Sequence, residues 1–286
     1  MTIAIEPLTS HESLLACERL QRKTASEGRE VLPAALLVAV GRSGGILLGA
    51  YDGDGESPPL CGCLIDLVSR YENSPARLTL VHTVAKEARN RGIGYLLRAK
   101  EREACRSEGA KVVTWTIDAL RSAEAHFAFN KLGAIAVAYE RNLFGERGEP
   151  GSHGLARDRL AVEWWIDSPR VSAILDHGEL PPHFRLGLDR MDVATRTALA
   201  ESGLRRLIGL KEDLRSDLVL VEVPTDLDAM WGLDPALARD WRLKTRECFE
   251  RLFAAGYIAC GFVHEAGRSF HLLERVPRDV FRKRAA

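Results

Sequence analysis

The chain has 286 residues, a length typical of roughly two domains, and its 46% apolar and 28% charged side chains are ordinary for a soluble globular protein. Forty basic residues balance 40 acidic ones, so the formal net charge is zero. No overall field favours nucleic acid or an anionic membrane surface, and neither is expected as a partner.

The N-terminus and the cysteines indicate a reduced, cytoplasmic protein. Residues 1–13 lack the basic and apolar regions of a signal peptide, and no stretch approaches the ~18 apolar residues of a membrane span. The six cysteines form no C-x-x-C pair and lie in apolar segments. Cys61 and Cys63 alternate along an expected strand, which favours core packing over metal binding, and no metal is expected.

The first 70 residues predict short elements of both kinds. Thr9 or Ser10 followed by Glu12 caps a helix, and Pro33 lies near the first turn of a second one. Glycine, aspartate and proline over 52–59 predict a turn. The expected elements are strands over 3–5, 45–51 and 60–68, and helices over about 10–23 and 33–40.

Residues 78–133 form the most informative stretch. An apolar, β-branched run over 78–85 predicts a strand, and a glycine turn at 89–94 leads into a helix that ends at Gly109. A buried strand over 111–117 and a helix over 122–132, closed by Gly133, follow. The expected apolar stripe of the first helix consists of Ile93, Leu96, Leu97, Lys100 and Ala104.

The chemistry of the turn at 89–94 points to an anion. Gly92 and Gly94 let the backbone approach a ligand, and the first amides of the following helix lack internal partners at the electropositive end of its dipole. Arg89 and Arg91 add formal charge. The segment therefore predicts a pyrophosphate site. Leu97 stands at the third glycine of a dinucleotide fingerprint, and no Gly-Lys-Ser/Thr follows, so neither a Rossmann nor a P-loop motif fits.

The remaining chain predicts two closing strands and a second α+β region. Strands are expected over 134–143 and 160–166 with a polar loop at 146–157 between them, and the pattern breaks at 167–169. The last 12 residues are expected to be a solvated end. FERLFAAGYIACGF parallels FAFNKLGAIAVAY, which indicates an imperfect repeat without a second phosphate turn. Further elements are expected over 218–223, 235–255, 256–263 and 269–273.

The Arg-x-x-Gly-x-Gly turn formed by Arg89, Gly92 and Gly94 resembles the hallmark of the GNAT superfamily of acyl-CoA-dependent N-acyltransferases. Phe129-x-Lys131-x-Gly133 is similar to the Tyr-x-Lys-x-Gly that closes the family's core. TWTIDALRS, NKLGA and DRLAVEWW look like a two-domain bacterial branch, some members of which are similar to amino-acid N-acetyl- or N-succinyltransferases.

The resemblance implies an α+β fold with a mixed, mostly antiparallel sheet flanked by helices. It implies an acyl-CoA-binding catalytic domain over 1–167 and a smaller α+β domain over 168–286 that repeats the second half of the GNAT fold. It also implies that pantetheine pairs beside the strand at 81–85, with a backbone N–H near Val84 facing the thioester oxygen. The alternative is an ordinary turn with solvated arginines. The cofactor-binding residues so implied are Val84, Ala85, Arg89, Asn90, Arg91, Gly92, Ile93, Gly94, Tyr95, Asn130 and Lys131.

The acid and base of the reaction stay open. The family tyrosine that protonates the departing thiolate is replaced by Phe129, so the thiolate leaves unprotonated or another group acts. His82, Asp118 and Tyr139 are the catalytic candidates, with His126 as a further one. A histidine on an apolar strand is more often a structural residue, and Asp118 could instead complement a helix dipole.

An amino-acid substrate calls for an arginine fork around its carboxylate. The alternative for the two arginines at 242 and 246 is pairing with Asp240, Glu247 and Glu250 on the same helix. The substrate-binding candidates are Arg121, Arg141, Trp241, Arg242 and Arg246.

The sequence therefore supports an enzyme that moves an acetyl or succinyl group from acetyl-CoA or succinyl-CoA to the amine of an amino acid or similar small molecule. No covalent acyl-enzyme is expected, because no Cys–His or Ser–His arrangement is visible. The alternatives are a non-catalytic acyl-CoA sensor of GNAT descent, which Phe129 favours, and a protein N-acetyltransferase. The oligomeric state is open, with a homodimer among the options.

Overall fold

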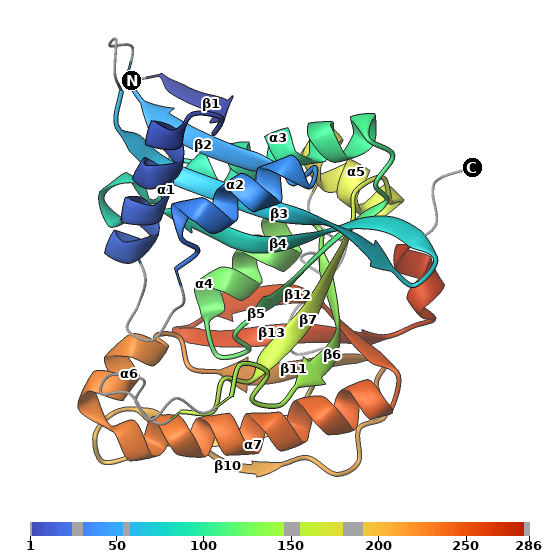
Figure 1. Ribbon diagram of the computed structural model, residues 1–286. Coiled ribbons are helices and arrows are strands. Elements are labelled where there is room, and N and C mark those ends of the chain that lie inside the picture. Colours follow the sequence, from blue (N-terminus) through green and yellow to red (C-terminus); the bar gives the residue numbers. More distant parts are fainter. Residues whose placement is uncertain (1, 25–30, 54–57, 146–154, 180–190, 283–286) are drawn as a thin grey trace. The chain divides into compact units, whose positions relative to one another are not determined.

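The computed structural model describes residues 2–24, 31–53, 58–145, 155–179 and 191–282 (Figure 1). The chain divides into two compact units, residues 1–115 and 116–286. The predicted fold class, a mixed α+β protein with a largely antiparallel sheet flanked by helices, is confirmed.

The described residues of the first unit contain strands in the order β1-β2-β3-β4-β5, and three α-helices. Neighbouring strands are antiparallel except for β4 and β5, which are parallel. The strands are β1 (Ile3–Pro7), β2 (Leu47–Asp52), β3 (Leu60–Tyr71), β4 (Ser74–Val84) and β5 (Val112–Ile117, which continues beyond this unit). The helices are α1 (His11–Thr24), α2 (Ala34–Arg42) and α3 (Ile93–Ser107), with a 3₁₀ turn η1 (Lys86–Ala88) after β4.

Helix α3 begins and ends where the sequence predicts, but its buried face is different. Leu96 is 39% exposed, and Lys100 is also exposed. The buried residues recur every four positions, starting at Ile93, and include charged side chains, which a search for apolar periodicity does not select. They are Ile93, Leu97, Arg98, Glu101, Arg102 and Cys105.

A buried polar cluster joins α3 to the middle of β4. Arg98 Nη1 donates to Thr79 Oγ1 at 2.8 Å and to Glu101 Oε2 at 2.8 Å, and its guanidinium lies 4.1 Å from the centre of the Trp115 ring. Buried charges are tolerated when they are paired and hydrogen-bonded in this way. The cluster fixes the height of α3 over the sheet, and with it the position of the turn that precedes the helix.

In the described part of the second unit, strands follow the order β7-β6-β12-β13-β11-β8, and β9 and β10 form a separate hairpin. Among the strand pairs described within this unit, β8 and β11 are parallel and the others are antiparallel. The strands are β6 (Ile135–Glu140), β7 (Arg159–Trp165), β8 (Asp192–Val193), β9 (Thr195–Leu199), β10 (Arg205–Leu210), β11 (Leu218–Val223), β12 (Tyr257–Glu265) and β13 (Arg268–Arg275). The helices are α4 (Ser122–Ala125), the π-helical η2 (His126–Lys131), α5 (Pro169–His177), α6 (Leu227–Leu233), α7 (Pro235–Ala254) and the 3₁₀ turn η5 (Arg278–Phe281).

Part of the order of elements over residues 112–165 recurs over residues 218–275. Strand β5, helix α4–η2 and the antiparallel pair β6–β7 correspond to β11, α7 and the antiparallel pair β12–β13. Strand β8 lies parallel to β11, as β4 lies parallel to β5. Within residues 191–218, however, a β-hairpin replaces the helix that carries the phosphate turn in the first copy. The second copy therefore has no corresponding turn.

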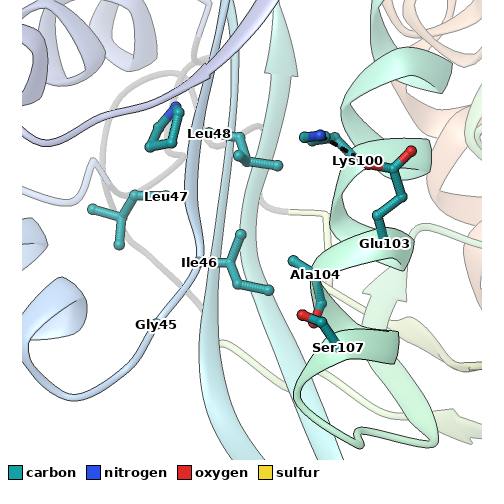
Figure 2. Close-up of a pocket in the computed structure, with 9 residues that line it drawn as sticks. Gly45, Ile46, Leu47, Leu48, Lys100, Glu103, Ala104 and Ser107 are labelled. Atoms are coloured by element: carbon teal, nitrogen blue, oxygen red, sulfur yellow. Dashed lines mark hydrogen bonds and ion pairs between the residues drawn. The ribbon is translucent and has the colours of Figure 1, made fainter.

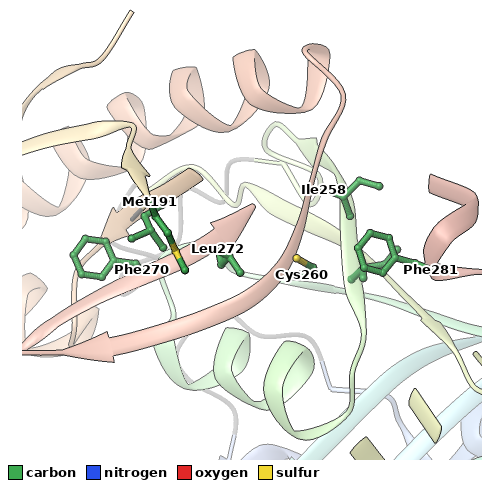
Figure 3. Close-up of a cluster of buried hydrophobic side chains, with 8 residues drawn as sticks. Met191, Ile258, Cys260, Phe270, Leu272 and Phe281 are labelled. Atoms are coloured by element: carbon green, nitrogen blue, oxygen red, sulfur yellow. The ribbon is translucent and has the colours of Figure 1, made fainter. Parts of the chain in front are cut away.

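The break expected at 167–169 falls at the start of α5, where Ser168 Oγ accepts from the Val171 N–H and Pro169 occupies the first turn. One sequence-based prediction for the second unit needs correction. The C-terminal segment is not simply solvated, because Phe281 is buried in the cluster shown in Figure 3. Most of the expected loop at 146–157 lies outside the described residues. The cluster of buried side chains in Figure 3 comprises Ile135, Met191, Leu220, Ile258, Cys260, Phe270, Leu272 and Phe281.

Candidate functional site: a phosphate turn and the open edge of β4

The predicted anion turn is preformed in the first unit. Gly92 is the N-cap of α3 with φ of 78°, and Asn90 also has a positive φ of 62°. The first backbone bond of the helix runs from the Leu96 N–H to the Gly92 carbonyl at 3.0 Å, so the amides of Ile93 and Gly94 precede the hydrogen-bonded ladder. A Cβ added at Gly92 would meet no atom within 4 Å. The turn thus combines unbonded first amides of a helix with room beside Gly92, two features that a bound phosphate would use.

Next to the turn, β4 extends past its pairing with β5. Among the described residues this pairing covers Ala76 to Leu78, although β4 continues to Val84. The Ala85 N–H donates to the Cys61 carbonyl at 2.8 Å, on the β3 side. Because backbone directions alternate along a strand, the N–H groups of Val84 and His82 point to the opposite edge, the one that pairs with β5 at Ala76 to Leu78. This is the direction that the predicted contact with a thioester oxygen needs.

His82 ties β4 to the turn. Its Nε2 lies 3.1 Å from the Gly94 carbonyl oxygen. A carbonyl only accepts, so Nε2 carries the proton in this contact, and in the neutral ring Nδ1 is the basic nitrogen. The contact gives His82 a structural role at the start of α3.

The two arginines of the turn differ in their surroundings. Arg89 is exposed, and its Nε lies 3.4 Å from the Val84 carbonyl. Arg91 forms a bidentate pair with Asp52, a residue that the sequence analysis missed. Ile93 is buried and offers only its backbone to a ligand, while Tyr95 is half-buried.

Asp118 and Arg242 form a buried bidentate pair in the second unit. The distances are 2.7 Å from Nη1 to Oδ1 and 2.6 Å from Nη2 to Oδ2. Although burial opposes ionisation, the guanidinium holds the pKa of Asp118 below its ordinary value. Asp118 also accepts from the Leu120 N–H at 2.9 Å. An aspartate so held is ionised at neutral pH and has little basicity to offer.

Tyr139 is also engaged by the chain itself. Its hydroxyl donates to Asp158 Oδ2 at 2.9 Å, and Arg246 pairs with the same carboxylate at 2.8 and 3.0 Å. Burial raises the pKa of Tyr139 far above its ordinary value. The side chain is half-buried and stacks on Phe249 at 5.7 Å. A donor role in catalysis would require this network to open.

The other substrate-binding candidates have internal partners too. Arg141 pairs with Glu250, and Arg121 forms a bidentate pair with Asp228 at 2.9 Å. The Trp241 indole is buried and donates to the Arg205 carbonyl at 2.9 Å. Arg242 and Arg246 also pair within the protein. The partners expected for them on α7 were wrong, because Arg242 pairs with Asp118 and Arg246 pairs with Asp158.

The end of the η2 helix is built into the sheet. The Asn130 amide donates to the Phe262 carbonyl at 2.6 Å and accepts from the Phe262 N–H at 3.0 Å, which adds a strand-like contact to β12. Phe129 is fully buried and packs edge-on against His271. His126 contacts Asn130 at 3.0 Å, and burial lowers the pKa of His126. Lys131 is exposed.

A shallow cavity of about 420 Å³ lies elsewhere in the first unit (Figure 2). Ile46 and Leu48 point toward α3 there, and the Lys100–Glu103 pair lies at its rim at 2.8 Å. It is lined by the C-terminal half of α3 and does not include the turn. Among the described residues no cluster of histidine, cysteine, aspartate or glutamate could hold a metal ion, and none of their helices is long and apolar enough to cross a membrane.

No protein-family model and no curated protein matches the sequence. Solved structures of N-acetyltransferases are similar at low identity. The ribosomal-protein-S18-alanine N-acetyltransferase of Escherichia coli is 13% identical, with 58% of this chain and 94% of that chain covered and a TM-score of 0.46. NAA60 of Arabidopsis thaliana in complex with acetyl-CoA is 16% identical, with 58% and 100% covered and a TM-score of 0.47. Ribosomal-protein-alanine N-acetyltransferase of Brucella melitensis is 20% identical, with 56% and 98% covered and a TM-score of 0.44. At identities of 13 to 20%, these similarities do not establish an activity for this chain.

Proposed function

We propose that the chain is an acyl-CoA-dependent N-acyltransferase of the GNAT type. It transfers an acetyl or succinyl group from CoA to the amine of an amino acid or related small molecule. The observation that carries the proposal is the turn at 89–94 beside the part of β4 that, among the described residues, extends past its pairing with β5. Helix amides and Arg89 would hold the pyrophosphate, and this part of β4 would pair with the pantetheine.

The reaction follows from these two features. The amine nitrogen attacks the thioester carbon, a C–N bond forms, the C–S bond breaks, and the amine proton passes to a base. The Val84 N–H points to the edge where the oxyanion would develop. His82 Nδ1 is the base that best fits the turn, because the other ring nitrogen is held by Gly94. The CoA thiolate can leave without an acid, because a thiolate is a weak base: the unperturbed pKa of a cysteine thiol, for comparison, is about 8.5.

The acceptor is less defined than the donor. Arg121, Arg141, Arg242 and Arg246 each face an internal carboxylate, so a substrate carboxylate would have to displace one of them. The exposed Arg121–Asp228 pair is the easiest to displace, because Asp228 is 73% exposed. A protein N-terminus or lysine remains a further acceptor class.

A second candidate function, an acyl-CoA sensor without turnover, is favoured by Phe129. This side chain lies in the core and cannot give a proton to the thiolate. The turn would serve a sensor and an enzyme equally well.

Release of free thiol from acetyl-CoA and succinyl-CoA tests the proposal against a panel of amino acids, simple amines and peptides. Thiol release that depends on an amine is the expected result and identifies the acceptor class. CoA binding without release across the panel would support the sensor instead. A chain that neither binds CoA nor releases thiol would contradict both.

A further inference from the structure

We propose that the ion pair with Asp52 keeps Arg91 from binding phosphate at the turn over 89–94. Arg89, and not Arg91, then supplies the cationic side chain of this turn. This inference rests on the proposed function, because it assigns the charges that face CoA. It changes the prediction from the sequence, in which both arginines bind the cofactor.

Both terminal nitrogens of the Arg91 guanidinium bond to the Asp52 carboxylate. Arg91 Nη1 donates to Asp52 Oδ2 at 2.5 Å, and Nη2 donates to Oδ1 at 2.8 Å. The two side chains are 32% and 22% exposed, so water shields the pair only in part. A two-bond fork of this kind is the strongest arrangement of an arginine and a carboxylate. The hydrogen bonds from Arg91 lower the pKa of Asp52, which is therefore ionised at neutral pH.

The backbone of Asp52 is held by the sheet. It is the last residue of β2, opposite Ile3 of β1, and its N–H donates to the Pro59 carbonyl at 3.2 Å. Arg91 comes from the turn itself, immediately before Gly92. The carboxylate is thus anchored on a strand, and it draws the arginine toward the β2 side.

Arg89 has a different environment. Its Nε lies near a neutral backbone carbonyl, that of Val84, and no carboxylate of the described residues pairs with it. The Arg91–Asp52 pair contributes no net charge at the turn, whereas Arg89 contributes a full positive charge. Asp52 should therefore lower the affinity for an anionic carrier, which favours release of product CoA.

Calorimetric titration of the full chain with CoA tests the inference through a double-mutant cycle. Asp52→Asn removes a negative charge near a dianionic pyrophosphate and should tighten binding roughly three- to tenfold at low salt. Arg91→Met leaves Asp52 unpaired and should weaken binding by a similar factor. The double variant removes the neutral pair and should bind within about twofold of the wild type.

Glu103→Gln is the matched control. It removes one negative charge from the same unit, but Glu103 lies on α3 ten residues after Ile93, which places it about 15 Å along the helix. Its affinity should equal that of the wild type. Arg89→Ala should weaken binding whether Asp52 is present or replaced.

The outcomes separate the inference from the proposed function. Weaker binding by Asp52→Asn, or a double variant that loses affinity tenfold, would show that Arg91 contacts the phosphates and would overturn the inference alone. Failure of the wild type to bind CoA would overturn the proposed function, and the inference with it.

Discussion

The proposed reaction gives His82 two tasks that substitution can separate. Nε2 contacts the Gly94 carbonyl at the start of α3, and Nδ1 would take the proton of the amine. A glutamine can donate to the same carbonyl but cannot act as a base. An alanine can do neither.

His82→Gln should therefore keep CoA affinity within about twofold and lower kcat by roughly 100-fold or more, the usual contribution of a general base. His82→Ala should weaken CoA binding as well. Steady-state kinetics and calorimetry measure the two effects. A kcat of His82→Gln equal to that of the wild type would leave His82 with its positioning role only.

His271 is the most deeply buried histidine among the described residues. Its Nε2 donates to the Ala119 carbonyl at 2.7 Å, and Phe249 and Phe262 pack edge-on at 5.2 Å. Burial lowers its pKa to about 4. The folded state therefore opposes protonation of His271. Above about pH 6.5 the ring is neutral in both the folded and the unfolded chain, so it has no effect on stability. As the pH falls from there toward 4, only the unfolded chain takes up the proton, and the free energy of unfolding decreases.

His271→Phe tests this sign. The variant should be less stable at pH 7.5, because the Ala119 carbonyl loses its donor, at a cost of about 1–3 kcal/mol. At pH 5 the deficit should shrink by roughly 2 kcal/mol, because only the wild type then opposes protonation. Urea unfolding at both pH values measures the change. A deficit that is the same at both values would show that His271 does not titrate on unfolding.

At the scale of elements, α7 presents one charged face to the first copy of the repeat. Arg242, Arg246 and Glu250 are four residues apart and lie on one side of the helix. Their partners are Asp118, Asp158 and Arg141, which follow β5, precede β7 and follow β6. The helix is thus fixed by charge pairs as well as by apolar packing.

The buried and exposed pairs of this region should differ in their contribution to stability. Arg242→Met leaves Asp118 charged and unpaired in a buried place and should lower the free energy of unfolding by about 3–5 kcal/mol. Arg121→Met breaks an exposed pair and should cost less than about 1 kcal/mol. Urea unfolding compares them. Equal losses would show that the Asp118–Arg242 pair is not buried in solution.

Most elements were predictable from the sequence because their signals are local. Alternation and apolar runs identified β11 and β12, and glycines marked the ends of α3 and η2. The short strands β8 to β10 were missed, since two- to six-residue strands with mixed burial lack a clear period. The charged inner face of α3 was missed because the burial of Arg98 and Glu101 depends on their hydrogen bonds to each other and to Thr79, which apolar periodicity does not reveal.

In the candidate site, too, the local part was predictable and the long-range partners were not. The turn is a local arrangement of glycines and arginines, so its conformation followed from the sequence. The partners of its candidates did not, because they lie 39 residues apart for Arg91 and Asp52, 88 for Arg246 and Asp158, and 124 for Arg242 and Asp118. No pattern along a chain connects residues at such separations.

For the whole molecule, the contacts within residues 116–286 bear on the domain division predicted at 167. Asn130 pairs with Phe262, Trp164 and Phe129 are fully buried, and Asp118 and Asp158 have their partners on α7. These contacts lead us to expect that an acyltransferase domain over 1–167 depends on residues 168–286 for its stability.

A chain truncated after residue 167 should therefore fail to unfold cooperatively, because two buried carboxylates and the edge of β6 lose their partners. Circular dichroism during thermal unfolding, with the full chain as the control, measures this. A truncated chain with a cooperative transition and CoA affinity like that of the full chain would show that the first 167 residues fold alone.

The central claim is that the turn at 89–94 binds CoA, and calorimetry of CoA with two glycine variants tests it most directly. Gly92 and Gly109 lie at opposite ends of α3, have φ of 78° and 76°, and both have open space where a Cβ would be. Gly92→Val and Gly109→Val thus carry the same backbone strain, but only the first places a side chain in the turn. Gly92→Val should abolish CoA binding while Gly109→Val retains it. Tight binding by Gly92→Val would show that CoA does not bind at this turn.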